Sequence, residues 1–314
     1  KVALNDSDIA MLAKIKTLED LRLNDCKMSA AGLSSLANIS TLRSISLQHS
    51  QVDDEDIAVI SRLPRLERLD LRDTAITDRS LESLGAVSTL RYLYLGGTKI
   101  GDPGLTSIKS LRLEALNISE TMITGKGLQQ IKDMDSLYSL MLARCAIGDA
   151  DLVALSHLSQ LNYLELSHDK ISPTGLKSLL GLIHLSWLQL DDTGIGDSAT
   201  PVLLRMRALR NLNLSQTNIT DATLQAIAAL PDLQSLTVLR TRITDAGVKS
   251  LSKTKQLSAL RANGTAITDA SLHALAAMPS LKTVELWDCQ NISRAAVNWF
   301  SQKRPDCEVK IYIN

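Results

Sequence analysis

The sequence predicts an α/β solenoid in which short parallel strands form one face and short helices form the other. Three observations support this fold class. An apolar pattern recurs every 24 residues along nearly the whole chain, each copy begins with the alternation of a strand, and each continues with the spacing of a helix. A fixed period of this kind indicates one elongated domain that grows by adding repeats, although 314 residues would otherwise suggest two domains.

The repeat is clearest in Leu209–Asp232, which reads LRNLNLSQTNITDATLQAIAALPD. Its first, fourth and sixth positions are leucines, so they face inward while the third, fifth and seventh positions face outward. The segment Leu224–Leu230 carries apolar residues at three-residue spacing, which predicts a short helix. Thr220, at position twelve, can cap that helix, and Asp221 suits the positive end of the helix dipole. Each repeat is therefore expected to contain one strand, one turn and one helix.

The same register repeats across residues 18–303 with a step of 24 residues, except for one step of 23. Residues 1–17 fit the second half of a partial repeat, with apolar residues at Leu4, Ile9, Leu12 and Ile15, so we expect the chain to be truncated at its N-terminus. The twelve repeats begin at Leu18, Leu42, Leu66, Leu90, Leu113, Leu137, Leu161, Leu185, Leu209, Leu233, Leu257 and Leu281.

The last residues depart from the repeat in a way that predicts a cap. Trp299 and Phe300 close the twelfth helix with more bulk than any other copy has. Residues 304–314 then offer Val309, Ile311 and Ile313 in alternation, which predicts a final strand. Such a cap would cover the open edge that a stack of strands otherwise exposes.

Two prolines mark expected changes on the helix side. Pro173 follows Ser172 and is expected in the first helical turn, where its missing N–H costs little. In the eighth repeat, Thr200 and Pro201 stand where an apolar residue and a helical residue are expected. We therefore expect that helix to begin late, with Thr200 as its cap.

The core pattern LxxLxL, seen as LERLDL in Leu66–Leu71 and LNYLEL in Leu161–Leu166, resembles the leucine-rich repeat family over nearly the whole chain. The motif Ile-Thr-Asp, as in Ile219–Asp221 and Ile243–Asp245, resembles the 24-residue bacterial "ITD" type and the related cysteine-containing class of F-box adaptors. The resemblance implies a right-handed β-α superhelix, with its parallel sheet on the concave face and its helices on the convex face. It also implies that the concave face binds a protein or peptide.

Charge and hydropathy exclude several other classes of function. Lys and Arg total 34 and Asp and Glu total 34, so no broad attraction to nucleic acid or anionic lipid is expected. No apolar run approaches the roughly 18 residues that a membrane-spanning helix needs. We therefore expect no nucleic-acid partner, no membrane insertion of this fragment, and a monomer.

The cysteines and histidines do not indicate chemistry. Cys26, Cys145 and Cys289 share position nine with Thr and Ser of other repeats, where a small inward side chain can bond the turn of its neighbour. Free structural thiols are favoured, although a Cys289–Cys307 pair stays conceivable. The five histidines lie in no nucleophile arrangement, and no glycine-rich phosphate loop follows a strand. We expect no catalytic, metal or cofactor site.

Aromatic residues gather at the outward strand positions. Of nine aromatics in the chain, about one would fall at positions three, five and seven by chance, and five do. Strands favour aromatic residues and neighbouring strands can pack them, which explains part of the excess. Tyr and Trp also dominate binding hot spots, so a binding surface is the favoured interpretation. The five residues are Tyr92, Tyr94, Tyr163, Trp187 and Trp287.

The centre of this expected surface is the pair Tyr163 and Trp187, which occupy the same position in adjacent repeats. Counting positions three, five, seven and eight, ten acidic residues face six basic ones, so the surface is mildly acidic and suits a partner with exposed Lys or Arg. Each of these charged residues, taken by itself, would also be explained by an ordinary solvated surface. The expected patch around the pair adds Met141, Glu165, Asp191 and Asp192, with Tyr92, Tyr94 and Trp287 extending it.

Three functions remain open from the sequence. The first is a non-enzymatic scaffold that binds a protein or peptide on the sheet. The second is the substrate-recognition region of a larger enzyme, F-box-like adaptor or secreted effector whose active module lies outside this fragment. The third is a structural or adhesive surface protein whose aromatics have no specific ligand.

Overall fold

The computed structural model describes residues 6–27 and 30–311, and it confirms the predicted repeat of one strand and one helical segment. The chain divides into two compact units. Unit 1 comprises Lys1–Ile147 with Ala154–Leu161, and unit 2 comprises Gly148–Val153 with Asn162–Asn314. The single elongated domain expected from the period stays a prediction. Among the residues used above, Leu4 and Ile313 lie outside the described part.

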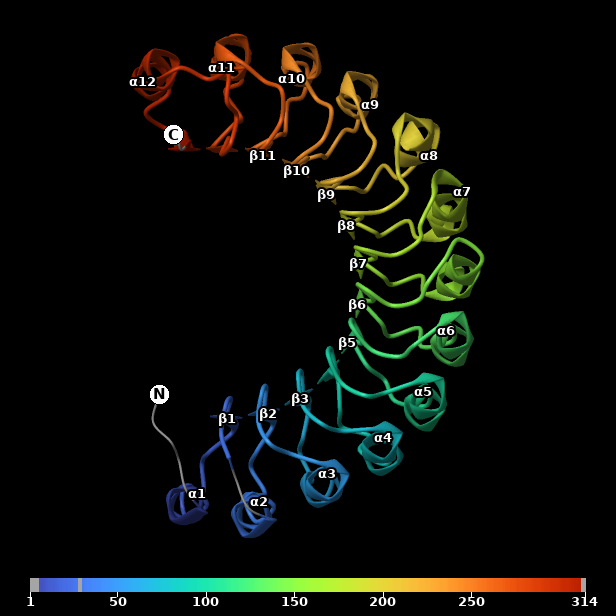
Figure 1. Cartoon of the computed structure of the whole chain (residues 1–314). Coiled ribbons are helices and arrows are strands. Elements are labelled where there is room, and N and C mark those ends of the chain that lie inside the picture. Colours follow the sequence, from blue (N-terminus) through green and yellow to red (C-terminus); the bar gives the residue numbers. More distant parts are fainter. Residues whose placement is uncertain (1–5, 28–29, 312–314) are drawn as a thin grey trace. The chain divides into compact units, whose positions relative to one another are not determined.

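The strands of unit 1 are three residues long, parallel, and paired in the order of the sequence. Leu69 faces Leu93 in the register, one 24-residue period apart, so identical positions of neighbouring repeats stand side by side. Each unit has its strands on one side and its helices on the other (Figure 1). The strands of unit 1 are β1 (Asp20–Arg22), β2 (Ser44–Ser46), β3 (Arg68–Asp70), β4 (Tyr92–Tyr94), β5 (Ala115–Asn117) and β6 (Ser139–Met141).

Unit 2 repeats the same parallel pairing from its first strand to its last. Residues Glu308–Lys310 form strand β13, which pairs with β12 and so adds a strand beyond the twelfth repeat. The strands of unit 2 are β7 (Tyr163–Glu165), β8 (Trp187–Gln189), β9 (Asn211–Asn213), β10 (Ser235–Thr237), β11 (Ala259–Arg261), β12 (Thr283–Glu285) and β13 (Glu308–Lys310).

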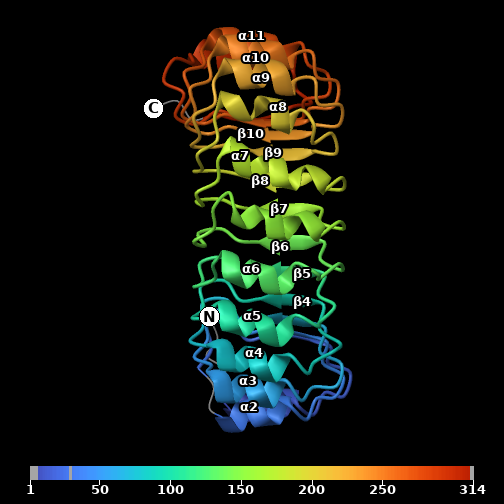
Figure 2. The same cartoon turned by 90° about the vertical axis from the view of Figure 1, so that its right-hand side faces the viewer.

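The helical segments are short, and three repeats use the tighter 3₁₀ form for all or part of them. In each unit, successive helices follow one another in chain order (Figure 2). The α-helices are α1 (Asp6–Leu12), α2 (Ala30–Leu36), α3 (Asp54–Ile60), α4 (Asp78–Leu84), α5 (Asp102–Ile108), α6 (Gly125–Ile131), α7 (Pro173–Leu176), α8 (Thr200–Leu203), α9 (Asp221–Ile227), α10 (Asp245–Leu251), α11 (Asp269–Ala276) and α12 (Arg294–Lys303). The 3₁₀ segments are η1 (Asp151–His157), η2 (Lys177–Gly181) and η3 (Asp197–Ala199).

The prediction that the eighth α-helix begins late is confirmed, but the expected role of Thr200 is wrong. Helix α8 begins at Thr200 after the 3₁₀ segment η3, and Thr200 itself has helical torsions of φ −50° and ψ −46°. Extended backbone precedes η3 at Gly196 instead. The Thr200 hydroxyl lies 3.3 Å from the hydroxyl of Thr223 in the next repeat, so it bridges two repeats rather than capping one.

The core of each unit consists of apolar columns between the strands and the helices. Leu69 and Leu93 in unit 1, and Leu212 and Leu236 in unit 2, are at most 2 % exposed. One row of helices covers one face of the sheet, so the inward position of the strands is buried, and in β5 the outward Ala115 and Asn117 are buried as well. In the other strands, positions three and five are at least partly exposed.

A column of left-handed residues follows the strands, one in every repeat at position eight. Ten are not glycine, and their φ values lie between 51° and 63°; Gly97 and Gly264 complete the column with φ values of 71° and 66°. The sequence pattern marks these positions only as part of the exposed face. A left-handed residue ends each strand and turns the chain toward the helix, at a cost of about 1 kcal/mol for a residue with a Cβ. The ten are Asp25, His49, Asp73, Glu120, Arg144, His168, Asp192, Gln216, Arg240 and Asp288.

Replacing Gly97 with alanine is expected to lower the free energy of unfolding by about 1–2 kcal/mol. Besides the left-handed backbone, an added Cβ would lie 2.3 Å from an oxygen of Asp73. Gly101→Ala is the control: Gly101 has an extended φ of −124° and an added Cβ would meet only ordinary contacts, so only the smaller cost of replacing an N-cap glycine is expected. Urea unfolding followed by circular dichroism measures both; equal losses would contradict the prediction.

Aspartates at position thirteen connect neighbouring repeats on the helix side. The carboxylate of Asp54 accepts the backbone N–H of Thr77 at 2.8 Å and the hydroxyl of Thr77 at 2.6 Å, and Ser80 donates to it at 2.6 Å. The threonine in turn caps its own helix α4. The sequence had assigned this aspartate to the helix dipole alone, whereas it also fixes the cap of the following repeat. Equivalent carboxylates are Asp78, Asp102, Asp149, Asp197, Asp221, Asp245 and Asp269.

Position nine shows two different hydrogen-bond patterns. The hydroxyl of Thr74 donates to the carbonyl of Leu71 in its own repeat, which differs from the predicted bond to the neighbour. The thiol of Cys145 donates instead to Ile118 of the preceding repeat at 3.1 Å. All four cysteines are buried and free, so the conceivable Cys289–Cys307 pair is not formed.

Candidate partner-binding surfaces

The aromatic pair expected from the sequence forms on the strand face of unit 2. Tyr163 in β7 and Trp187 in β8 are direct partners in the register, with ring centroids 5.5 Å apart and planes tilted by 46°. Trp187 is 41 % exposed, whereas Tyr163 is intermediate in exposure. The pair therefore presents a held aromatic surface to solvent, an arrangement that interface hot spots favour.

Acidic side chains lie beside the pair, and a histidine lies among them. Nδ1 of His168 lies 2.8 Å from Asp192, and its Nε2 lies 3.6 Å from Asp191. Ser167 and Asn213 also donate to Asp191 at 2.5 and 2.9 Å. We call Tyr163, Glu165, His168, Trp187, Asp191 and Asp192 the Tyr163 cluster.

Burial and like charge shift two groups of the Tyr163 cluster. Burial, the nearby Asp191 and weaker effects leave the pKa of Glu165 above its ordinary value. Burial first, then the carboxylates of Glu165 and Asp191, raise the pKa of Tyr163 to about 12. The phenol of Tyr163 therefore stays protonated at neutral pH, and Trp187 and Tyr163 both carry a hydrogen-bond donor. Because the Tyr163 hydroxyl is hydrogen-bonded to Glu165, the indole N–H of Trp187 is the donor that the cluster offers a ligand, beside carboxylates that can accept a cation.

The other two predicted tyrosines form a different cluster in unit 1, organised by an arginine. The guanidinium of Arg68 lies 4.1 Å above the ring centroid of Tyr92, its direct partner in β4, and donates to the hydroxyl of Tyr94 at 2.9 Å. The hydroxyl of Tyr92 donates to Glu114 at 2.6 Å, and this bond raises the pKa of Tyr92. Arg72 pairs with Asp70 through two bonds at 2.9 and 2.6 Å.

A hollow of about 410 Å³ opens beside these residues on the strand face of unit 1. Its wall contains Arg22, Arg68 and Arg72, but only one carboxylate, that of Asp70. We call this concavity the Arg68 hollow. The remaining lining residues are Asn24, Ser44, Ile45, Ser46, Gln48, Tyr94, Asn117 and Met141.

The structure does not gather all predicted site residues into one patch. Met141, which was predicted beside the Tyr163–Trp187 pair, belongs to unit 1 and lines the Arg68 hollow with Tyr94. Trp287 is 42 % exposed and lies four strands along unit 2 from Trp187, roughly 19 Å at the usual strand spacing. It lines a separate hollow of about 350 Å³ with Arg240, Asn263, Gly264, Asp288, Gln216 and Leu239.

Sequence reasoning missed Arg68 and His168 as parts of these surfaces, although the repeat register held a signal for both. Arg68 lies one period before Tyr92, so the two are necessarily neighbours in a parallel sheet. His168 lies one period before Asp192 in the same way. A count of charges over the whole face does not show which charges stand beside which aromatic residues.

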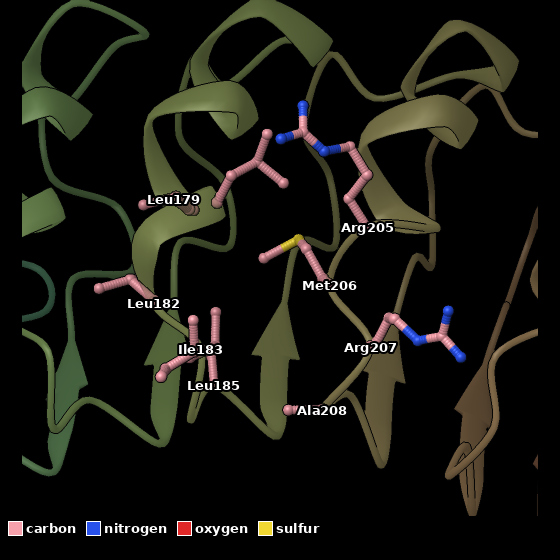
Figure 3. A pocket seen from close by; sticks show the side chains of 9 residues that line it. Leu179, Leu182, Ile183, Leu185, Arg205, Met206, Arg207 and Ala208 are labelled. Atoms are coloured by element: carbon pink, nitrogen blue, oxygen red, sulfur yellow. The ribbon is translucent and has the colours of Figure 1, made fainter.

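A further hollow on the helix side of unit 2 was also missed. It measures about 250 Å³ and lies beside the 3₁₀ segment η2 and the loop before β9, with Met206 on its floor and Arg205 and Arg207 at its border (Figure 3). Ile183, one of its lining residues, is 70 % exposed. The α-helices of the seventh and eighth repeats, α7 and α8, have four residues each.

The described part of the chain contains neither a metal-binding cluster nor a membrane-spanning helix. Within residues 6–27 and 30–311, no three His, Cys, Asp or Glu side chains come together closely enough to hold a metal ion. Across the same residues, no helix combines the length and the apolar character needed to cross a bilayer.

Comparison with protein families gives one match, to a model described as Leucine Rich repeat, over residues 14–37, 63–85 and 88–109. Each matched segment corresponds in length to one repeat of the chain. Comparison with curated proteins gives no significant match.

Solved structures share the architecture. An internalin (inlF) of Listeria monocytogenes is 19 % identical, with a TM-score of 0.55, and the match covers 89 % of this chain and 93 % of that one. A leucine-rich repeat protein of Leptospira interrogans is 17 % identical, with a TM-score of 0.61 and coverage of 99 % and 81 %. The mouse RP105/MD-1 complex gives 17 % identity, a TM-score of 0.65 and coverage of 99 % of this chain but 57 % of the matched chain. At these identities the likeness concerns the fold alone.

Proposed function

Because this chain is a leucine-rich repeat protein with an exposed aromatic pair on one strand face, we propose that it is a non-enzymatic scaffold that binds a protein or peptide. The observation that carries the proposal is the Tyr163–Trp187 pair. A soluble surface gains nothing from holding a Trp 41 % exposed against a Tyr on a rigid sheet, whereas a binding site does.

The charges around the pair favour a partner segment that carries Lys or Arg next to an apolar residue. Glu165, Asp191 and Asp192 lie beside rings that can also accept a cation over their faces. Complementary charge increases the rate of encounter and fixes the register, while the aromatic pair supplies most of the affinity.

Rigidity of the repeats supports the same function. Tyr163 and Trp187 stand on paired strands, and Asp191 is held by Ser167 and Asn213, so little side-chain freedom remains to be lost on binding. The mouse structure among the relatives is a complex with a second protein. That complex supports the general idea that the fold can serve binding, without identifying a partner for this chain.

Peptides selected on the full chain by display are expected to bind through the Tyr163 cluster. The double change Tyr163→Ala and Trp187→Ala should weaken the selected peptides by about 30-fold or more, because hot-spot truncation typically costs at least 2 kcal/mol. Isothermal titration calorimetry measures the affinity, and circular dichroism confirms that the variant is folded.

Tyr138→Ala provides the matched control, since Tyr138 is exposed by 55 % and lies outside the Tyr163 cluster. Its affinity for the selected peptides should equal that of the unchanged chain. Full binding by the double variant would show that the Tyr163 cluster is not the binding centre. Failure to select any peptide would argue against peptide binding on this surface.

A further inference from the structure

The Arg68 hollow of unit 1 differs in charge from the Tyr163 cluster of unit 2. Arg22, Arg68 and Arg72 line it, and Asp70 is its one carboxylate. The face as a whole was expected to be mildly acidic, so this local excess of positive charge is not explained by the average composition.

Arg68 is held by two tyrosines rather than by an acidic group, among the residues that the structure describes. Its guanidinium stacks on Tyr92 and donates one hydrogen bond to Tyr94. A guanidinium has five N–H donors, so four remain for another acceptor. Because Glu114 anchors the hydroxyl of Tyr92, the ring beneath Arg68 is itself fixed.

Arg72 and Arg22 supply the remaining positive charge of the Arg68 hollow. Arg72 is bound to Asp70, and its second contact, to Gln48, spans 3.4 Å. The side chain of Arg22 is 77 % exposed, and its contact with Asp20 at 3.6 Å leaves it largely in solvent. Arg22 can therefore turn toward a ligand without leaving a buried acid unpaired, whereas Arg72 stays paired with Asp70, whose side chain is only 13 % exposed.

We infer that the Arg68 hollow binds an acidic peptide segment, with a Glu or Asp carboxylate paired to Arg68. Arginine can hold a carboxylate through two parallel N–H donors, and Ser44, Ser46 and Asn117 in the same hollow can bond the peptide backbone. The short strands and the volume of about 410 Å³ fit a few residues of an extended segment rather than a folded domain.

This inference rests on the proposed peptide-binding role of the strand faces but concerns a second surface with the opposite preference. A single-stranded nucleic acid would also be attracted by arginines and tyrosines. The peptide is favoured because Tyr92 and Tyr94 are not free for base stacking: Arg68 covers one ring, and Arg68 and Arg72 both lie within 5.7 Å of the other.

The test uses the full chain and a fluorescein-labelled peptide of six glutamates, with fluorescence anisotropy as the measurement. Binding is expected below about 1 mM. Arg68→Gln should weaken it by about tenfold or more, because it removes a charge-assisted bond. Tyr94→Phe keeps the ring but releases Arg68, so a loss of about threefold is expected, within the range of one neutral hydrogen bond.

Arg112→Gln removes the same charge from an exposed loop of unit 1 and should leave the affinity unchanged. Thermal unfolding of each variant establishes that it is folded. Equal affinities for Arg68→Gln and Arg112→Gln would overturn the inference, as would no binding by the unchanged chain.

A labelled six-lysine peptide and a labelled six-nucleotide thymidine strand complete the test. Tighter binding of the thymidine strand than of the glutamate peptide would overturn the inference in favour of nucleic acid. The lysine peptide should not bind in the Arg68 hollow, and Arg68→Gln should leave any lysine-peptide binding intact. All variants lie in unit 1, so their failure would leave the proposal for the Tyr163 cluster untouched.

Discussion

Phe300→Ala is expected to lower the free energy of unfolding by about 3–5 kcal/mol, the usual range for a buried phenylalanine. Phe300 is 0 % exposed and stands on α12, which packs against α11. The loss combines the apolar area returned to water with the cavity left behind. Urea unfolding followed by tryptophan fluorescence gives the value.

The neighbouring Trp299 provides the control for this prediction. Trp299 is 37 % exposed and contacts the ring of His273 at a centroid distance of 4.1 Å. Trp299→Ala should therefore cost only about 1 kcal/mol, the scale of one aromatic contact. Hydrogen exchange should show the Phe300→Ala loss concentrated at β12 and β13, since each repeat of a solenoid contacts only its neighbours. A similar cost for both changes would contradict the assigned role of Phe300.

Asp245→Ala is expected to cost about 3 kcal/mol, because it leaves three donors of the next repeat without their acceptor. Those donors are the N–H and hydroxyl of Thr268 and the hydroxyl of Ser271. Asp221→Ala should cost less, since Asp221 accepts from two donors of Thr244 only. Asp232→Ala, in an exposed loop, should be nearly neutral. Urea midpoints rank the three variants.

The same carboxylate should make stability fall in acid. Partial burial raises the pKa of Asp245, but hydrogen bonds from Ser271 and Thr268 outweigh it, so its pKa lies below the ordinary value. A carboxyl whose pKa is lower in the folded state stabilises the fold above its unfolded pKa, near 4, and loses this contribution as pH falls below it. The urea midpoint of Asp245→Ala should therefore change less between pH 7 and pH 3 than that of the unchanged chain. If the variant and the unchanged chain had the same pH dependence, the loss of stability in acid would not come from the hydrogen bonds to Asp245.

The fold could be predicted because its determinants are local and repeated. Each of the residues that determine the fold acts within its own repeat or on the next one. These residues are the leucines at positions four and six, the threonine at position twelve and, in the eighth repeat, Pro201. The role of Thr200 could not be predicted, since the choice between a cap and a helical residue depends on whether η3 forms before it. The ITD subtype also stays a prediction.

The candidate site was predicted less completely, for a geometric reason. Tyr163 and Trp187 were found because the register alone makes them neighbours. The hollow that Tyr94 and Met141 line was not predicted. A hollow depends on the length and direction of the side chains around it, and the register does not give these. The register does predict the pairing of Arg68 with Tyr92, because the two residues are one period apart. A sum of the charges over the face does not show this pairing.

The left-handed residue after every strand has an evolutionary consequence. Asp, His, Glu, Arg and Gln all occupy this position with φ values between 51° and 63°, so an exchange among these residues changes the charge of one edge while the backbone keeps its conformation. His168, Asp192 and Arg240 all occupy this column, and each takes part in a different surface. Such a chain can acquire a new partner by altering one column of side chains while the scaffold that carries them stays the same.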